Sequence, residues 1–170
     1  NAYFIGDYPR ALALFQSLAD QGDPVAQVSL GYMFTDGLGV SQNFSLGLAW
    51  FELAADQGDA DAQYNVAMAY GLGQGTNQDT FIAAQWYTMA AHQGHAWAQA
   101  ELAELFAAGR GVGRDITIAY AWAAVAAEQG VDSAAETRDA LAAGLSPEAF
   151  DAAFTLAQEF WQQYVVPFRN

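Results

Sequence analysis

Ala19-Asp20-Gln21-Gly22-Asp23 is the first of four related segments, followed by Ala55-Asp56-Gln57-Gly58-Asp59, Ala91-His92-Gln93-Gly94-His95 and Ala127-Glu128-Gln129-Gly130-Val131. Their glycines stand 36 residues apart. The same step links Ala26, Ala62, Ala98 and Ala134, and also Gln27, Gln63 and Gln99. A fixed period of this length is typical of repeat proteins built from one supersecondary unit.

Apolar residues between these glycines fall at helical spacing, as in Ala11, Leu14, Phe15 and Leu18. A second set of glycines divides each unit in two, at Gly37 and Gly39, Gly73 and Gly75, and Gly109 and Gly111. Each unit is therefore predicted to be a helical hairpin. The pattern predicts helices near residues 8–20, 24–35, 44–56, 60–71, 80–92, 96–107, 116–128, 132–142 and 147–164.

Capping signals support these boundaries. Asn43, Asp79 and Asp115 recur before alternate helices, where a short acceptor side chain can bond free backbone N–H groups. The last segment has its own start signal, with Ser146 as N-cap, Pro147 at the first helical position, and Leu145 and Phe150 as a hydrophobic staple. Its aromatic stripe predicts a helix that caps the C-terminal end of the array.

The composition excludes several classes of protein. The 170 residues are 54% hydrophobic and contain no cysteine, which excludes a disordered chain, a disulfide scaffold and a thiolate metal site. The five basic residues are all Arg, and the formal net charge is −14, so nucleic acid and anionic membranes are repulsive partners. No apolar run is long enough to span a bilayer. The first residues lack the pattern of a signal peptide, and whether a segment precedes residue 1 stays open.

The residues also carry a resemblance to a known family. The pattern Ala26-Gln27-x-x-Leu30-Gly31-x-x-Phe34-x-x-Gly37-x-Gly39-Val40, followed by Ala49-Trp50-Phe51-x-x-Ala54-Ala55-x-x-Gly58, resembles a Sel1-like repeat, a relative of the tetratricopeptide repeat. The resemblance implies an all-α fold, a right-handed α/α solenoid of helical hairpins. It predicts a single domain over 1–170, with hairpins over about 7–145 and the capping helix over about 146–165. The fourth copy departs from the pattern, with Ala135 where Gln is expected and no G-x-G loop.

The resemblance further implies a non-catalytic adaptor that binds proteins. Many bacterial members are exported, so a periplasmic or secreted location is expected, with the cytoplasm left open. In the related tetratricopeptide proteins, helices equivalent to those near 24, 60, 96 and 132 line a concave groove. Residues that leave the shared pattern on these helices are the predicted partner-binding residues: Tyr32, Asp61, Tyr64, Asn65, Met68, Trp97, Glu101 and Glu104.

This predicted groove is aromatic and acidic and contains no basic residue, which suits a peptide with apolar and Arg or Lys side chains. Trp97 is the leading candidate, because its counterparts Val25, Asp61 and Ser133 are small or polar. The alternatives are that Trp97 packs on a neighbouring hairpin, and that Glu101 and Glu104 belong to a solvated face. Trp50, Trp86 and Trp122 recur in phase, which predicts packing and not a site.

Two weaker motifs are interpreted as structural. His92 and His95 have a metal-like spacing, but their counterparts are mostly Asp, so we expect solvated histidines. The run from Gly109 to Arg114 superficially suggests a phosphate cradle, but the glycines recur in other repeats and are expected to shape a tight loop. No cofactor, metal or catalytic residue is predicted.

Two alternatives to a protein adaptor stay open. One is a protein that binds a cell-wall fragment or small ligand, or a cell-wall-active enzyme. The other is self-association, in which an exposed first hairpin around Tyr3, Phe4 and Tyr8 stacks on another copy.

Overall fold

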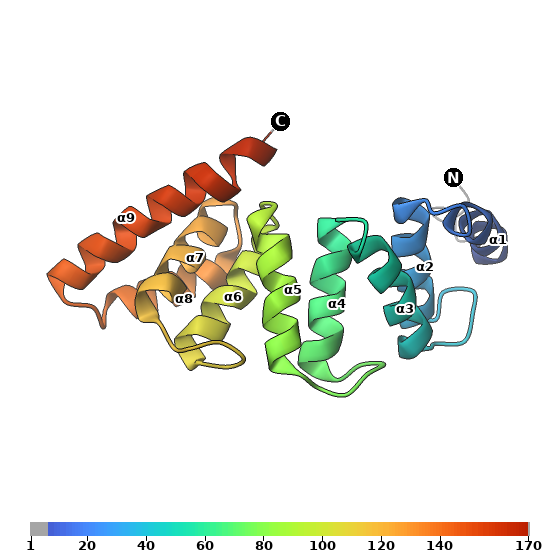
Figure 1. The fold of residues 1–170 in the computed structure, drawn as a ribbon, viewed down its shortest axis with the longest axis horizontal. Helices are drawn as coiled ribbons and strands as arrows, with labels where there is room; N and C mark the ends of the chain where they lie inside the picture. The colour runs from blue at the N-terminus through green and yellow to red at the C-terminus, as the bar shows by residue number, and fades with distance from the viewer. Residues whose placement is uncertain (1–6, 170) are drawn as a thin grey trace. The chain divides into compact units, whose positions relative to one another are not determined.

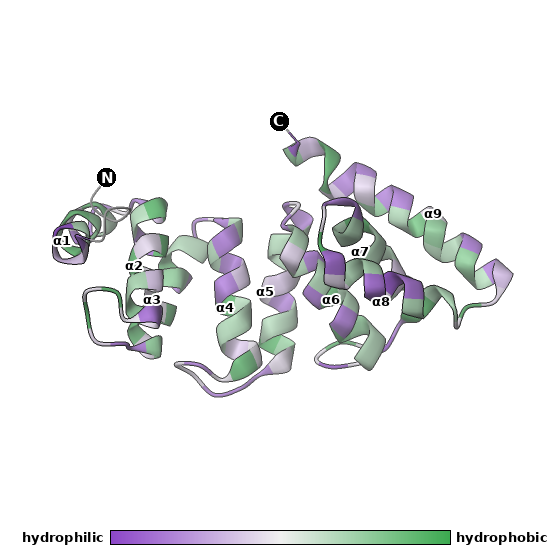
Figure 2. Ribbon diagram, turned by 180° about the vertical axis from the view of Figure 1, so that it is seen from behind, coloured by the Kyte–Doolittle hydropathy of each residue, from purple (hydrophilic) through white to green (hydrophobic). Residues whose placement is uncertain are grey.

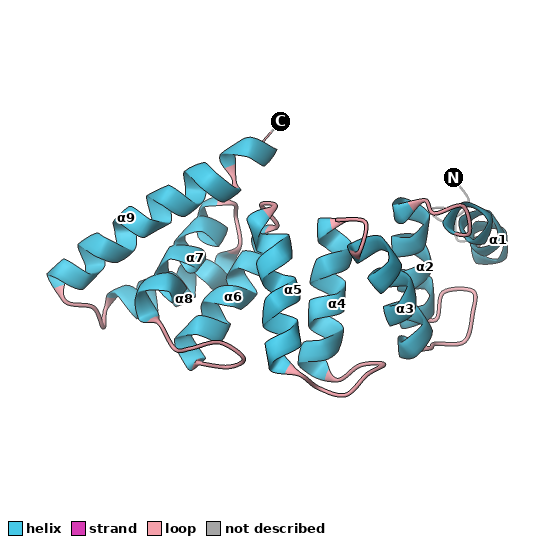
Figure 3. Cartoon of the chain, viewed as in Figure 1, coloured by secondary structure: helices cyan, strands magenta, loops and turns pink. Residues whose placement is uncertain are grey.

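The computed structural model describes residues 7–169, and these residues form nine α-helices, one short 3-10 helix and no strand (Figure 3). The α-helices are α1 (Tyr8–Ala19), α2 (Pro24–Asp36), α3 (Phe44–Ala55), α4 (Ala60–Leu72), α5 (Thr80–His92), α6 (Ala96–Ala108), α7 (Ile116–Glu128), α8 (Asp132–Ala142) and α9 (Pro147–Tyr164). The 3-10 helix η1 spans Val166–Phe168. The predicted all-α repeat of hairpins is confirmed, with boundaries at or within one residue of those expected.

The described residues divide into two compact units, one ending at Asp79 and the other beginning at Thr80. Helices α1, α3, α5 and α7 are called A helices here, and α2, α4, α6 and α8 are called B helices. In the first unit α2 packs against both α1 and α3, and in the second α6 packs against both α5 and α7 (Figure 1). In each unit, therefore, one B helix packs between two A helices.

Buried glutamines join neighbouring hairpins through the recurring Gln positions. Gln27 donates to the Ala19 carbonyl at 3.4 Å, and its own amide oxygen accepts from Gln57 at 2.7 Å. Gln99 makes the equivalent bonds in the second unit, to the Ala91 carbonyl at 3.0 Å and from Gln129 at 2.5 Å. A buried amide without partners would cost stability. These bonds therefore explain why Gln recurs both at the position of Gln27 and Gln99 and at the position of Gln57 and Gln129.

Glycine allows α2 and α3 to approach each other closely. Leu30 and Leu102 are fully buried, as expected for core positions. Gly31 of α2 faces the Phe51 ring of α3 so closely that a Cβ at Gly31 would overlap the ring. A Cβ at Gly47 would in turn lie 3.0 Å from the Gly31 carbonyl oxygen. The α2–α3 contact thus depends on missing side chains on both helices.

Helix α9 packs on α7, where Ala153 and Ala157 are buried against Tyr120 and Ala121. Its predicted start is confirmed, because the Ser146 hydroxyl accepts from the Ala149 N–H at 3.2 Å. Val125 of α7 is only 1% exposed, whereas its counterparts Leu53 and Met89 are 49% and 41% exposed. Since α9 covers a face that the other A helices leave open, it acts as a cover for α7.

Candidate functional site

In the first unit, the predicted site residues of α2 and α4 are joined by a hydrogen bond. The Asn65 amide nitrogen donates to the Tyr32 hydroxyl at 2.8 Å and to the Asp61 carbonyl at 2.8 Å. The Tyr32 ring contacts Phe51 edge to face, with centroids 5.2 Å apart, and the residue keeps 37% of its surface exposed. Tyr32 is therefore anchored at its ring and at its hydroxyl while one face stays open to solvent.

The remaining predicted residues of this unit lie on α4. Asp61 is exposed, whereas Tyr64 and Met68 are half-buried. The spacing of Asp61, Asn65 and Met68 places them on one face of the helix. We call the set Tyr32, Asp61, Tyr64, Asn65 and Met68 the α2–α4 patch.

In the second unit, α6 presents an aromatic residue followed by two acids. Trp97, Glu101 and Glu104 are spaced four and three residues apart, which places them on one face of the helix. Trp97 is 56% exposed. The Glu104 carboxylate accepts from the Thr137 hydroxyl of α8 at 2.6 Å. We call these three residues the α6 patch.

The α6 patch has a distinct electrostatic character. Desolvation is the main cause that raises the pKa of Glu101, the charge of Glu104 raises it further, and Arg110 lowers it. Glu101 is nevertheless exposed as a residue. A cation beside Glu101 and Glu104 would reduce the repulsion between the two carboxylates. An exposed indole such as that of Trp97 is also a group that binds cations.

The two patches share one geometric relation. Tyr32 and Glu104 occupy the same repeat position, and so do Asn65 and Thr137. Both bonds join residues 33 apart on successive B helices. This pairing of neighbouring B helices was not predicted, because the period shows which positions are equivalent but not which of them touch.

The two histidines have structural roles that were not expected: His92 is an exposed surface residue, as predicted, but makes ring contacts, and His95 is half-buried. The His92 ring stacks on Tyr164 with centroids 4.3 Å apart and on Trp122 at 5.9 Å, although the residue stays exposed. Partial burial lowers the pKa of His92. The Nδ1 of His95 accepts from the Ala98 N–H at 3.1 Å and caps α6.

The sequence did contain a signal for the cap at His95. Its counterparts Asp23 and Asp59 accept from the N–H groups of Ala26 and Ala62, at 2.9 and 2.8 Å. A recurring Asp immediately before a helix is an N-cap signal, and a neutral imidazole nitrogen can accept the same bond.

The glycine-rich loop after α6 has the expected structural role. Gly109 and Gly111 have φ values of 67° and 70°, like the glycines of the two preceding loops. Arg114 donates from Nε to the Ala107 carbonyl at 3.0 Å. In the earlier loops Gln42 and Gln78 bond the equivalent carbonyls, both at 2.7 Å. Arg114 thus closes a loop.

The recurring tryptophans pack as predicted where their contacts are defined. Trp50 lies against the cluster of Ala19, Ala26 and Leu30, and Trp122 is 3% exposed beside Phe160.

Over residues 7–169, no group of three His, Asp or Glu side chains could hold a metal ion. In the same residues, no helix is long and apolar enough to cross a membrane. Of the residues invoked for self-association, Tyr3 and Phe4 lie outside the described range, and Tyr8 opens α1.

Comparison with known proteins points to one family. The sequence model of the Sel1 repeat matches residues 4–23, 24–59, 60–95 and 98–131, which is more than half of the chain. A protective antigen of uropathogenic Escherichia coli with an SLR fold is 30% identical over 92% of this chain, with a TM-score of 0.85. A Sel1 repeat protein from Oxalobacter formigenes is 25% identical, with a TM-score of 0.74 over 98% of this chain and 84% of its own length. The chain spans 34% of the length of the E. coli antigen. No curated protein matches the sequence.

Proposed function

Because the chain belongs to the Sel1 repeat family, whose repeats typically mediate protein–protein interactions, we propose that it is a non-catalytic adaptor that binds a peptide segment with basic and apolar side chains. The binding residues in this proposal are those of the α6 patch and the α2–α4 patch. The partner is a protein, and no cofactor takes part.

The exposure of Trp97 carries the proposal. An indole that is 56% exposed, at a position where the other repeats have Val25, Asp61 and Ser133, adds nothing to the shared core. Exposed Trp and Tyr residues are the residue types that dominate protein interfaces. Glu101 and Glu104 on the same face select for a cationic side chain, and the net charge of −14 attracts a basic partner over longer distances.

The α2–α4 patch supplies the complementary apolar contact. Tyr32 is held by Asn65 and Phe51, so its open face is ordered before a partner arrives. Ordered side chains lose less conformational entropy on binding than mobile ones do. Met68 provides an adaptable thioether surface on the neighbouring helix.

The experiment selects partners from a random library of displayed peptides. The full chain is the bait, and each selected peptide is then titrated into a variant with Trp97→Ala, Glu101→Gln and Glu104→Gln. The expected peptides contain Arg or Lys next to apolar residues, and their affinity falls as salt rises. Peptides that bind parent and variant equally, or binding that ignores salt, would contradict the proposal.

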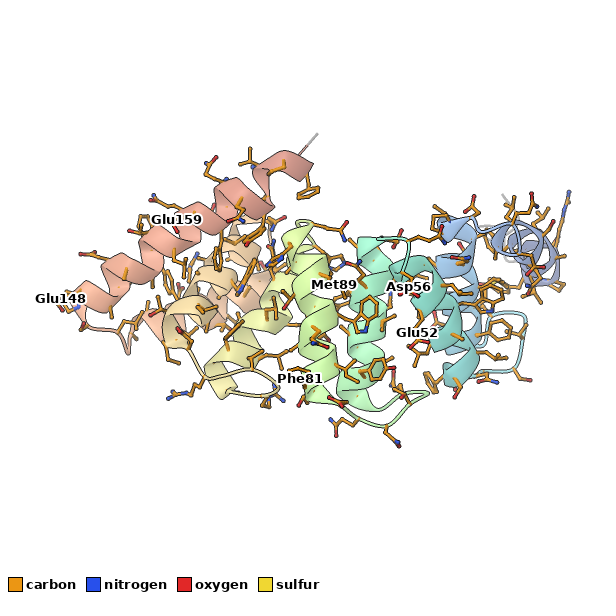
Figure 4. The ribbon with its side chains drawn as sticks, viewed as in Figure 1. Glu52, Asp56, Phe81, Met89, Glu148 and Glu159 are labelled. Atoms are coloured by element: carbon orange, nitrogen blue, oxygen red, sulfur yellow. The ribbon has the colours of Figure 1, made fainter. Side chains whose placement is uncertain are left out.

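A control for lost surface area is available in the same unit. Phe81 of α5 is 60% exposed and lies on an A helix (Figure 4). Phe81→Ala removes an exposed aromatic ring that belongs to neither patch, so it should leave peptide affinity unchanged. Trp97→Ala should weaken binding by about tenfold or more, which is the effect of removing an interface hot spot.

The proposed compartment is the bacterial envelope. Support comes from the E. coli structure, which is described as that of a protective antigen. Fractionation of the native host, followed by detection of this protein, tests the proposal. Recovery in the cytoplasm alone would contradict it.

A further inference from the structure

A hollow of about 760 Å³ lies between α7, α8 and α9. Helices α8 and α9 both pack on α7, and the hollow opens between them. Aromatic and aliphatic groups form most of its lining, with two glutamines and two charged groups added: Tyr120, Ala124, Val125, Glu128, Arg138, Phe154, Ala157, Gln158, Trp161 and Gln162. Its volume is that of an ordinary small-ligand site.

Glu128 is the acidic group in the lining of this hollow. It is the last residue of α7, and the described part of the chain offers its carboxylate no hydrogen bond or ion pair. The C-terminal end of a helix carries a partial negative charge that adds to that of the carboxylate. A cation in the hollow would therefore meet two favourable fields.

Arg138, the cationic group of the lining, is already paired on its own helix. Its Nε and Nη2 both contact the Asp139 carboxylate at 2.8 Å, which offsets part of its charge. Burial is the main cause that raises the pKa of Tyr120, and the charge of Arg138 opposes this rise more than that of Asp139 adds to it. The position is unusual for Arg, because its counterparts Leu30, Val66 and Leu102 are fully buried. Arg138 stays 29% exposed and lines the hollow. The helix that carries it, α8, is largely hydrophilic in Figure 2.

Trp161 already receives a cation from this chain. The Arg169 guanidinium carbon lies 4.8 Å from the centre of the Trp161 ring. Indole is the aromatic group that binds cations best. Phe154, which is 48% exposed, adds a second open ring to the same wall.

We propose that this hollow binds an organic cation with an apolar body, such as a guanidinium or ammonium group on an aliphatic chain. Glu128 pairs with the charge, Trp161 presents its ring to the cation, and Phe154 and Ala157 contact the apolar body. Gln158 and Gln162 lie one turn apart on α9 and bond the polar atoms next to the cation. The site shares no residue with the α2–α4 and α6 patches, so it stands or falls independently of the proposed function.

The experiment titrates the intact chain with N-acetyl-arginine amide by calorimetry and two-dimensional NMR. The neutral isostere N-acetyl-citrulline amide is the ligand control, and acetyl-Leu-Arg-Leu amide is the peptide form. We expect saturable binding of the arginine compound and at least fivefold weaker binding of the citrulline compound. If N-acetyl-arginine amide and the Leu-Arg-Leu peptide bind equally well, the natural ligand is a small molecule. If the peptide binds clearly more tightly, the natural ligand is an Arg or Lys side chain of a protein partner.

Variants separate the site from general charge effects. Glu128→Gln should weaken binding at least fivefold. Glu159→Gln removes an equal charge from α9, outside the lining of the hollow, and should change binding less than twofold (Figure 4). Arg169→Ala should strengthen binding, because the competing internal cation is gone. The proposal is overturned by an absence of saturable binding, by equal binding of citrulline, or by equal effects of the two glutamine substitutions.

Discussion

The Tyr32 hydroxyl accepts a hydrogen bond from the Asn65 amide, 2.8 Å away on the next B helix. The bond joins two hairpins at a position where the second unit uses Glu104 and Thr137 instead. Neighbouring B helices are thus joined by side chains that differ between repeats. The residues that leave the repeat pattern help to hold successive hairpins together and also provide the proposed binding surface.

This bond should be measurable by a double-mutant cycle. Tyr32→Phe keeps the ring contact with Phe51 but removes the acceptor, and Asn65→Ala removes the donor. Each should lower the free energy of unfolding, with a coupling of about 0.5–1 kcal/mol, typical of one hydrogen bond at a partly exposed site. Urea unfolding of the four proteins gives the value. Strictly additive effects would show that the bond contributes nothing to stability.

Gly31→Ala should be strongly destabilising for its size. The added Cβ would overlap the Phe51 ring, so α2 and α3 must move apart. Overpacking of this kind costs about 1–3 kcal/mol. Gly113→Ala is the control, because a Cβ there meets nothing within 4 Å. Thermal unfolding compares the two, and similar midpoints would show that the close approach of α2 and α3 is not required.

His95→Ala should lower stability by about 1 kcal/mol, the usual effect of losing an N-cap bond. His95→Asp should retain most of the stability, because Asp23 and Asp59 cap the equivalent helices. Chemical unfolding at neutral pH distinguishes the variants. If both substitutions cost the same, the Nδ1 bond is not what stabilises the start of α6.

The stability of the second unit should depend on pH through His92. Burial lowers its pKa in the folded protein from the ordinary value of 6.5. The unfolded chain therefore binds more protons in the interval below 6.5, and stability falls as the pH decreases through that interval. His92→Phe keeps a ring against Tyr164 and should reduce this loss. An unchanged pH dependence of the unfolding midpoint would contradict the assignment.

Glu101→Gln should separate stability from binding. Because the pKa of Glu101 is raised in the folded state, its ionisation opposes folding, and this cost grows as the pH rises above the ordinary value of 4.5. The variant should be at least as stable as the parent at neutral pH but should bind basic peptides less tightly. Such opposite effects are characteristic of functional residues. A variant that binds as well as the parent would remove Glu101 from the site.

The sequence predicted the helices and the packing positions well because both follow from periodicity. Leu30 and Trp122 recur in phase and are buried, and Ser146 caps its helix. Periodicity shows only what the repeats share. It could not reveal contacts of residues that are found in one repeat alone or outside the repeats. The stacking of His92 on Tyr164 depends on α9, which lies outside the repeat pattern, so the sequence offered no signal for it.

The candidate site was predictable only as a set of positions. The exposure of Trp97 agrees with its departure from the pattern, and the spacing of Glu101 and Glu104 placed them beside it. The bonds that Asn65 and Glu104 make to neighbouring helices could not be predicted, because they depend on the distance between helices. The hollow beside Glu128 was also missed, since its walls come from three helices with different patterns.

The affinity of one library-selected peptide for Trp97→Ala and for Phe81→Ala tests the central claim most directly. If the residues that break the repeat pattern on the B helices bind the partner, the first variant loses about tenfold or more in affinity, and the second binds like the parent. Equal affinities for the two variants would show that Trp97 is a surface residue without a role in recognition.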